Sequence, residues 1–302
     1  MPGLKELRQR ITTVRSTQKM TRAMNLIATT RLRGARAAIE ATRPYAKTLD
    51  GMMAQICARV PAVAEQMPLF AGTGREQVHL LVVFTTDRGL CGGLNTGVVK
   101  MVKQRIARLA EHGQTTRLLC IGRKGRRLLE REHGDKIVET MEHGHYHKVG
   151  FEHARLIADK ILALFHTGQF DVCCQHYARF RSILHQPPKA QQLVPMRFAV
   201  MTTAAELAGY RLHGMPMATY EPDEAEVLRQ LLPHQVTTQV YRALLECAAS
   251  EEGARIAATD RATRNAGELI RKLSLAYNRQ RQAAITREIT EIVAGVEAQR
   301  GR

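Results

Sequence analysis

The chain has 302 residues and carries 45 Lys and Arg against 28 Asp and Glu, a formal net charge of +17. Because 44% of the residues are apolar, the chain can bury a core, which excludes wholesale disorder. No run approaches the roughly 18 apolar residues of a membrane span, and the first residues lack the apolar stretch of a secretory signal. Six cysteines without CxxC spacing indicate a reducing compartment.

Residues 4–43 contain one glycine and no proline, so nothing in this segment should end a helix. Apolar residues recur in alternating steps of three and four, which is the heptad pattern of a coiled coil. This seam is apolar at both ends and polar in its middle, and it comprises Leu4, Leu7, Ile11, Val14, Gln18, Thr21, Asn25, Ala28, Leu32, Ala35 and Ile39. We expect Pro44 to kink or interrupt the helix.

The middle of the chain alternates short apolar runs with helical patterns, which is typical of an α/β domain with a mostly parallel sheet. We expect strands at 79–85, 118–121, 171–175 and 193–200, and helices at 95–112, about 123–132 and 151–166. Cys173 and Cys174 would then point to opposite faces of one strand. This placement favours two core residues over a redox pair.

The C-terminal third returns to a long helical pattern that can begin directly after Pro222, with a second start or a kink at Pro233. Its seam of small and apolar residues comprises Val240, Ala243, Cys247, Ala254, Ala257, Ala266, Leu269, Leu273, Ala276, Ile285, Ile289, Ile292 and Val296. Two long seams at opposite ends of a chain most simply pair with each other, antiparallel, although a partner chain supplying either half is the alternative. We therefore expect coiled-coil helices at 1–58 and 222–298 around a central α/β domain at 76–210.

The positive charge is concentrated near the N-terminus. Residues 1–50 hold eleven Lys or Arg and three Asp or Glu, a local net charge of +8. Such a segment suits a solvated helix face, an acidic protein, an anionic membrane or nucleic acid. Because the chain has no Trp, and residues 1–43 have no Phe or Tyr to stack on bases, we place an acidic protein above nucleic acid.

Two glycine-containing loops follow expected strands, where phosphate groups bind in many α/β proteins. The first comprises Asp87, Arg88, Gly89, Leu90, Cys91, Gly92 and Gly93, and it has neither the GxGxxG nor the GxxxxGK[ST] order. A tight turn with positive φ at its glycines is therefore favoured over a nucleotide site. Arg88 could lower the pKa of the Cys91 thiol, but a turn cysteine of ordinary reactivity is favoured. The second loop, at 122–125, is interpreted as a basic helix start.

Three alternating histidines, His143, His145 and His147, are of a type that binds zinc or nickel. Since no cysteine or carboxylate lies in register with them, a polar loop is the favoured interpretation. The sequence contains no HExxH, no GxSxG and no cysteine and histidine in a nucleophile context. We therefore expect no catalytic residue, no metal and no cofactor.

Three motifs, in order along the chain, carry a resemblance to a known family. They are STQKMTRAM at 16–24 with Arg43-Pro44-Tyr45, TDRGLCGGLN at 86–95, and DRATRNAGE at 260–268 followed by the segment 277–286. In these motifs the chain resembles the γ subunit of the rotary F-type ATP synthase, the rotor shaft of the central stalk. The stretch at 134–149 has no counterpart that we can match. The absence of the inserted cysteine pair of the chloroplast form favours a bacterial source.

The resemblance implies a non-catalytic rotor subunit of a proton-translocating enzyme. Its two terminal helices would wind antiparallel inside a ring of three α and three β subunits, while a Rossmann-like body grips ε and the membrane ring of c subunits. The nucleotides would sit on α and β. Membrane association would come only through the complex, peripheral on the cytoplasmic side of the bacterial inner membrane.

The resemblance also implies roles for individual residues. It places at the α/β ring the residues Lys19, Arg22, Met24, Arg255, Arg281, Gln282 and Thr286. It places in an apolar sleeve the residues Ile285, Ile289, Ile292 and Val296, for which coiled-coil core is the plainer interpretation, and both can hold. The polar middle of the first seam is interpreted as opened toward the surrounding subunits, and the +8 of residues 1–50 suits acidic loops of β.

Two other classes of protein remain as alternatives. A basic nucleic-acid-binding coiled-coil protein would be retained on DNA in a salt-dependent way. A nucleotide-dependent α/β enzyme using residues 89–93 would show saturable nucleotide binding by the isolated chain.

Overall fold

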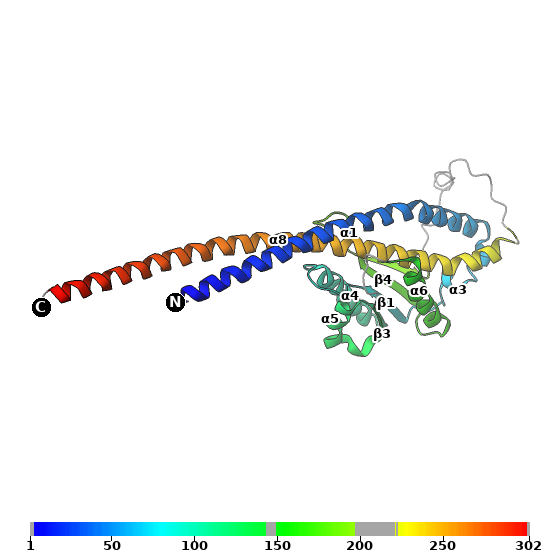
Figure 1. The fold of residues 1–302 in the computed structure, drawn as a ribbon. Helices are drawn as coiled ribbons and strands as arrows, with labels where there is room; N and C mark the ends of the chain where they lie inside the picture. The colour runs from blue at the N-terminus through cyan, green and yellow to red at the C-terminus, as the bar shows by residue number, and fades with distance from the viewer. Residues whose placement is uncertain (1–2, 143–148, 197–220, 222, 301–302) are drawn as a thin grey trace. The chain divides into compact units, whose positions relative to one another are not determined.

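The computed structural model describes residues 3–142, 149–196, 221 and 223–300, and it divides into two compact units that are described separately. One unit is built from the two ends of the chain, 1–28 and 256–302, and the other from residues 29–255. Helices α1 (Leu4–Arg59) and α8 (Glu224–Arg300) contribute to both (Figure 1). The histidines at 143, 145 and 147, and residues 197–200 of an expected strand, lie outside the described residues.

An interruption at Pro44 and a second helix start at Pro233, each expected as one alternative to a kink, are wrong, since both prolines lie inside continuous helical segments. A mid-helix proline removes one backbone donor and costs about 3 kcal/mol. The residues that follow Pro44 offset this cost by packing: Ala46, Leu49 and Met53 are all buried. Tertiary packing therefore outweighs the local preference, which the sequence pattern alone does not reveal.

The unit formed by the chain ends is an antiparallel helix pair, as expected. Gln18 Nε2 donates to the Thr263 carbonyl (3.3 Å), and the Thr21 and Thr263 hydroxyls lie 2.7 Å apart. Further along α1, Asn25 Nδ2 donates to the Ile256 carbonyl (3.1 Å) and to the Thr259 hydroxyl (3.2 Å). As the residue number rises along α1 it falls along α8, which sets the two helices in opposite directions.

These contacts also correct the interpretation of the polar seam. Gln18, Thr21 and Asn25 are half-buried between the two helices and are not opened toward a partner. Polar residues in a coiled-coil seam are satisfied by polar groups on the facing helix, and such pairs fix the register. The hydroxyl and carbonyl groups of α8 provide those partners here, so this seam fixes the register within the chain.

The C-terminal seam also differs from the expectation in its middle. Leu269 and Ala276 are exposed, while Ala266 is buried and Ile270 and Tyr277 are half-buried. A heptad assumes 3.5 residues per turn, whereas a straight α-helix has about 3.6, so the inward face drifts along a long helix. The predicted seam therefore moves off the inward face by one position.

We expect Leu273→Asp to destabilise the helix pair by about 1–3 kcal/mol, because Leu273 is half-buried and a carboxylate there loses apolar contacts and water. Leu275→Asp is the matched control, since Leu275 is 67% exposed on the same helix. The loss of stability should appear as faster hydrogen exchange of the α1 amides at 7–28. Equal exchange in the two variants would contradict the inward placement of Leu273.

The other unit contains a five-stranded sheet in the order β3-β2-β1-β4-β5. The strands are β1 (Val78–Phe84), β2 (Thr115–Ile121), β3 (Ile137–Met141), β4 (Val172–Ala178) and β5 (Pro188–Val194). The first four run parallel and β5 is antiparallel to β4. The mostly parallel sheet is thus confirmed, but β5 begins before the predicted strand at 193–200. We missed β3 because its five residues show no apolar run.

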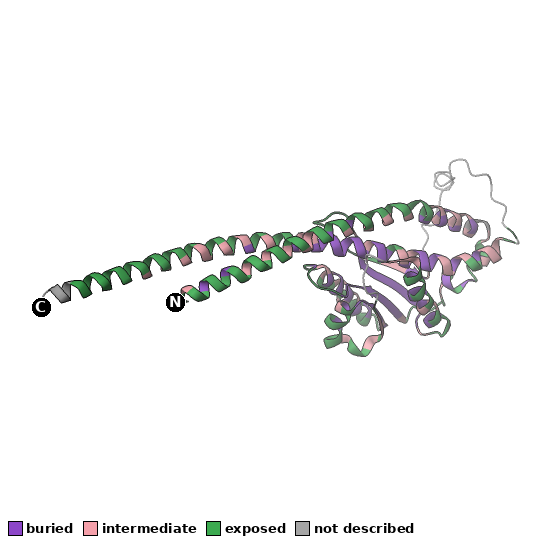
Figure 2. Ribbon diagram, viewed as in Figure 1, coloured by how far each residue is buried: buried purple, intermediate pink, exposed green. Residues whose placement is uncertain are grey.

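Helices cover both faces of this sheet, as Figure 1 shows. One face packs against α4 (Leu94–Glu111) and α5 (Arg123–His133), and the other against α6 (Phe151–His166) together with parts of α1 and α8. The sheet lies buried between these layers in Figure 2. Cys173 belongs to the α6 side and Cys174 to the α4 side, and both are buried. Their placement on opposite faces of a core strand is confirmed. The short helices α2 (Pro61–Ala64) and α3 (Pro68–Ala71) and the 3-10 turn η1 (Gly134–Lys136) complete the unit.

Candidate functional site

The loop at 87–93 lies at the carboxyl end of β1, where the strand order reverses: the chain runs outward from β1 through β2 to β3 and then returns to β4 on the other side of β1. Ligands of open α/β sheets bind at such a crossover point. The geometry of this loop therefore decides between a binding site and a structural turn.

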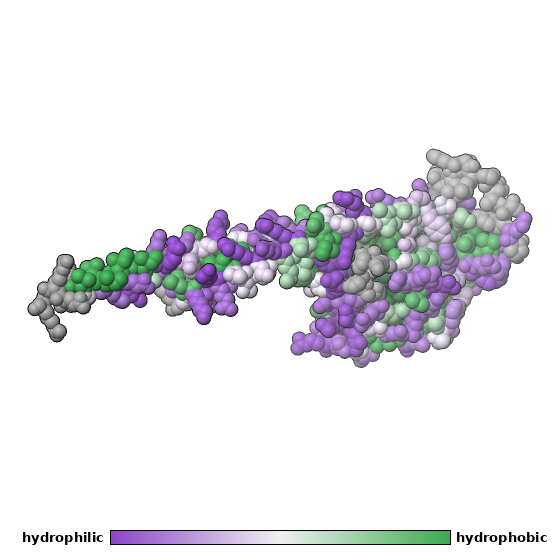
Figure 3. Space-filling model, viewed as in Figure 1, coloured by the Kyte–Doolittle hydropathy of each residue, from purple (hydrophilic) through white to green (hydrophobic). Residues whose placement is uncertain are grey.

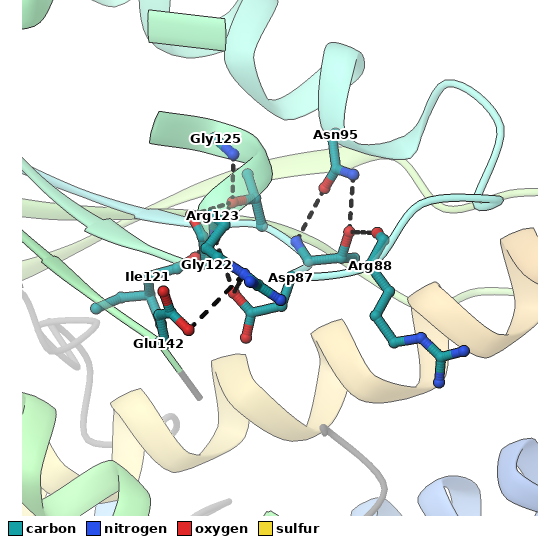
Figure 4. Close-up of polar contacts among 10 residues, drawn as sticks. Asp87, Arg88, Asn95, Ile121, Gly122, Arg123, Gly125 and Glu142 are labelled. Atoms are coloured by element: carbon teal, nitrogen blue, oxygen red, sulfur yellow. Dashed lines mark hydrogen bonds and ion pairs between the residues drawn. The ribbon is translucent and has the colours of Figure 1, made fainter. Parts of the chain in front are cut away.

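Polar groups at this strand end bond to one another (Figure 4). Asn95 accepts from the Thr86 amide (3.0 Å) and donates to the Thr86 hydroxyl (2.8 Å) and the Cys91 sulfur (3.3 Å). Asp87 accepts from the Arg123 amide (2.8 Å), and its side chain is only 2% exposed. The groups that would hold a phosphate are thus engaged in joining β1 to the starts of α4 and α5.

Two glycines of the second loop allow this close approach. Gly122 has φ +102°, and a Cβ there would lie 2.7 Å from the Thr85 carbonyl carbon and closer still to its oxygen. A Cβ on Gly125 would lie 2.6 Å from the Thr85 hydroxyl, which accepts a hydrogen bond from the Gly125 amide (2.8 Å). The segment 122–125 is therefore the basic helix start that we expected, and it also packs closely against the end of β1.

The tight turn in the first loop is confirmed in part. Gly92 has φ +56°, but the second left-handed residue is Leu90 (φ +64°) and not another glycine. Burial raises the pKa of the Cys91 thiol, so the alternative of a lowered pKa beside Arg88 is wrong. The loop therefore offers no activated nucleophile.

The structure places Arg255 inside a buried ion cluster that our sequence analysis missed. Arg255 is 7% exposed and forms ion pairs with Glu251 and, at 2.7 Å, with Glu252. Arg31 of α1 lies 3.9 Å from Glu252. A pair of carboxylates three and four residues before an arginine, within a seam of small residues, is the sequence signal that could have revealed this cluster.

The 87–93 loop lies near this cluster. Burial raises the pKa of the Glu251 carboxyl, while the charges of Arg255 and Arg88 act in the opposite direction. Glu251 in turn contributes to the raised pKa of Cys91. Only the second of the three motifs that carry the resemblance takes part here, through Arg88 and Cys91, since Glu251 and Arg255 lie before the motif at 260–268.

The other expected contact residues lie on the helix pair, at two levels. Lys19 and Arg22 are exposed and Met24 is half-buried, and this part of α1 is level with Thr263 of α8. Arg281, Gln282 and Thr286 are exposed and begin 18 residues further along α8, which at 1.5 Å per residue is about 27 Å away. They therefore form two separate groups.

The end of α8 carries an exposed apolar stripe, visible in Figure 3. Ile285, Ile289 and Ile292 are 46%, 56% and 66% exposed, and Val293 and Val296 are 51% and 46% exposed. Thr21 faces Thr263 and Asn25 faces Thr259, so the two residue numbers of a facing pair add up to about 284. By the same rule, the start of α1 at Leu4 is level with about residue 280 of α8. Beyond that level α8 has no partner helix among the described residues. Coiled-coil core within this chain is therefore excluded for the stripe.

In the part of the chain that the structure describes, no helix is both long and apolar enough to cross a membrane. The same residues contain no group of three His, Cys, Asp or Glu side chains placed to hold a metal ion.

Comparisons with known proteins agree with this architecture. A family model described as ATP synthase matches residues 3–299. The ATP synthase gamma chain of Parvibaculum lavamentivorans is 44% identical over 298 residues, covering 99% of this chain and 100% of that protein. The gamma chain of Beijerinckia indica is 46% identical over 299 residues, with the same coverage.

Solved structures share the fold. A chain of the Euglena gracilis mitochondrial ATP synthase, from its OSCP/F1/c-ring assembly, has a TM-score of 0.67 at 16% identity, covering 98% of this chain and 94% of that one. A chain from the central stalk and c-ring of the Tetrahymena thermophila enzyme has a TM-score of 0.58 at 24% identity, covering 80% and 99%. At these identities the likeness concerns the fold alone.

Proposed function

The chain belongs to the ATP synthase gamma chain family, and we propose that it is the central-stalk rotor subunit of a proton-translocating F-type ATP synthase. In this role it transmits rotation between a membrane ring of c subunits and a catalytic ring of three α and three β subunits. It is a non-catalytic subunit. The observation that supports this function best is the antiparallel helix pair from which one helix continues alone, with an exposed apolar stripe.

The helix pair suits a shaft. Rotation of an asymmetric shaft presents different side chains to each β subunit in turn, and each β conformation is favoured by the contacts it makes. Shaft contacts with the ring are proposed for Lys19, Arg22, Met24, Arg281, Gln282 and Thr286. For Arg255, which is buried, we propose an indirect role, in which it holds α8 in the geometry that the coupling needs.

The exposed stripe suits an apolar sleeve at the far end of the catalytic ring. An apolar side chain that is half-exposed in the free chain gains about 25 cal/mol for each Å² that a partner covers. The body formed by residues 29–255 is proposed to hold ε and the c ring. The complex is membrane-associated, and we propose a peripheral position on the cytoplasmic side of a bacterial inner membrane.

Reconstitution tests this function. The purified chain is mixed with matched α and β subunits, and the product is examined by gel filtration and an ATP hydrolysis assay. We expect one large complex that contains a single copy of this chain and turns over ATP faster than α and β alone. Folded partners that exclude the chain would refute the proposal. Salt-dependent retention on DNA that competes with α/β binding would favour the nucleic-acid alternative.

We expect Met24→Lys to impair coupling more than stability, because it adds a cation beside Lys19 and Arg22, where acidic loops of β are proposed to contact the shaft. Proton pumping per ATP hydrolysed, measured in inverted membrane vesicles, should fall while the urea midpoint of the free chain changes little. Leu26→Lys adds the same charge at a position that is 70% exposed on the same helix, and serves as the control. Normal coupling in Met24→Lys would place that contact elsewhere.

A further inference from the structure

A pocket of about 320 Å³ opens on the α4 side of the sheet, above strands β4 and β5. Its wall is one face of α4, with Met101, Gln104, Arg105 and Arg108. The topology explains the opening. The chain passes from β4 to β5 through residues 179–187, which form no helix, so α4 must cover this edge of the sheet from its place above the neighbouring strands.

The floor of the pocket follows from the pairing of the two strands. Cys174 pairs with Gln192 and His176 with Ala190, so these four side chains share the α4 face of the sheet. Gln191, although it lines the pocket, directs its side chain to the other face, where it bonds to Tyr177 and Gln239. The floor is therefore largely apolar, with one imidazole and one amide.

The imidazole of His176 is buried, and one of its two ring nitrogens lacks a hydrogen-bond partner within the described part of the chain. The residue is 1% exposed, and its Nδ1 has no hydrogen-bond partner among the described residues. Buried polar atoms nearly always have a partner, so this nitrogen is an exception, although it lies beneath the pocket surface and is not itself exposed there. Burial lowers the pKa of His176 to about 4, with a smaller contribution from the charge of Arg105, so the ring is neutral at physiological pH.

The wall provides positive charge without internal compensation. Arg105 is half-buried and Arg108 is exposed, and neither forms an ion pair with any side chain that the structure describes. Arginine is suited to oxyanions, because its guanidinium offers several donors in a planar fork. Apolar floor, neutral imidazole and two uncompensated arginines are the features of a site for a small anion with an apolar part.

We propose that this pocket, lined by Met101, Arg105, Arg108, Cys174, His176 and Ala190, binds a small oxyanion joined to a compact apolar body. The oxyanion bonds to the two guanidinium groups, and the body lies against Cys174 and Ala190. The residues of this site belong to the unit at 29–255, whereas Lys19 to Met24 and Arg281 to Thr286 belong to the other unit.

Phenyl phosphate is the probe, and its ³¹P resonance is followed while the full-length chain is added. We expect saturable binding with a Kd of about 1 mM or tighter. Arg105→Gln and Arg108→Gln should each weaken binding about tenfold, because a hydrogen bond to a charged group is lost. Ala190→Leu should block the pocket, since it adds bulk at an exposed floor position of the edge strand.

The controls separate this pocket from general attraction to a chain of charge +17. Arg127→Gln removes the same charge from an exposed position of α5 and should leave binding unchanged. Inorganic phosphate carries the oxyanion without the apolar ring and should bind more weakly than phenyl phosphate. Benzoate carries a carboxylate on the same ring and should compete with phenyl phosphate for the pocket. All variants are first checked for the wild-type urea midpoint, and Arg108→Gln, at an exposed position, remains informative if Arg105→Gln unfolds.

Absence of saturation up to about 10 mM phenyl phosphate would overturn the proposal. Equal weakening by Arg127→Gln and Arg108→Gln would overturn it as well, since the binding would then be diffuse. Inorganic phosphate that binds as tightly as phenyl phosphate, and is unaffected by Ala190→Leu, would likewise exclude the apolar part of the site.

Discussion

Gly122→Ala is expected to destabilise the body formed by residues 29–255 by about 3 kcal/mol or more. The added methyl group would lie 2.7 Å from the backbone carbonyl carbon of Thr85, which cannot swing away as a flexible side chain can. In addition, the φ of +102° at this position is one that an L-residue rarely adopts. Either β1 or the start of α5 must therefore move. This movement would strain the hydrogen bonds between the Thr85 hydroxyl and the backbone of Ile121 and Gly125.

Hydrogen exchange of the β1 and β2 amides in increasing urea is the appropriate measurement, because the long helices dominate circular dichroism. Gly92→Ala is the matched control. Its φ is also positive (+56°), but no atom lies within 4 Å of the added Cβ. It should therefore cost only the conformational term of about 1–2 kcal/mol. Equal losses in the two variants would show that the contact with Thr85 contributes nothing beyond the backbone conformation.

Arg255→Met is expected to cost about 3–5 kcal/mol, because it leaves the buried carboxylates of Glu251 and Glu252 without their partner. The methionine occupies a similar volume, so the loss is electrostatic in the main. Burial already raises the pKa of Glu251, and the loss of the Arg255 charge raises this pKa further, so the carboxylate binds a proton more readily. Stability gained from that protonation is present at low pH and is lost as the pH rises through the raised pKa.

The unfolding free energy of Arg255→Met should therefore lie closer to that of the wild type at acidic pH and fall further below it as the pH rises through the raised pKa of Glu251. Arg264→Met is the control, since Arg264 and its partner Asp260 are exposed at the surface of α8 (2.7 Å) and such pairs contribute about 0.3–0.5 kcal/mol. If Arg255→Met showed the same small, pH-independent loss as Arg264→Met, the cluster would have no structural role. In the assembled complex, the same substitution tests whether Arg255 acts on coupling through the position of α8.

The sequence predicts the layered architecture well where a pattern repeats. Strands β1, β2 and β4 are apolar runs, and the two long seams extend over many turns, so small errors in any one position do not change the result. It fails where a single local rule is overridden. Pro44 predicts a kink or an interruption, but the helix continues through it, because the burial of Ala46 and Leu49 on the same helix outweighs the missing donor.

The candidate site was less predictable, because its contacts join residues far apart in the chain. Asn25 and Thr259 are separated by 234 positions, and their hydrogen bond turns an apparently open polar seam into a closed one. The cluster of Glu251, Glu252 and Arg255 likewise looks like an ordinary charged helix turn until the packing shows that it is buried. Exposure is a property of the fold, so polarity alone gave the wrong interpretation in both cases.

The level at which α1 begins has an elastic consequence. Up to about residue 280, two helices share any applied twist, and the hydrogen bonds of Gln18, Thr21 and Asn25 oppose sliding of one past the other. Beyond that level a single helix carries the whole load and bends and twists more easily, until a surrounding wall supports it. Deformation of a loaded shaft would therefore be concentrated at 281–296, the segment with the exposed isoleucines. In mechanical terms this end is a compliant tip on a stiffer stem.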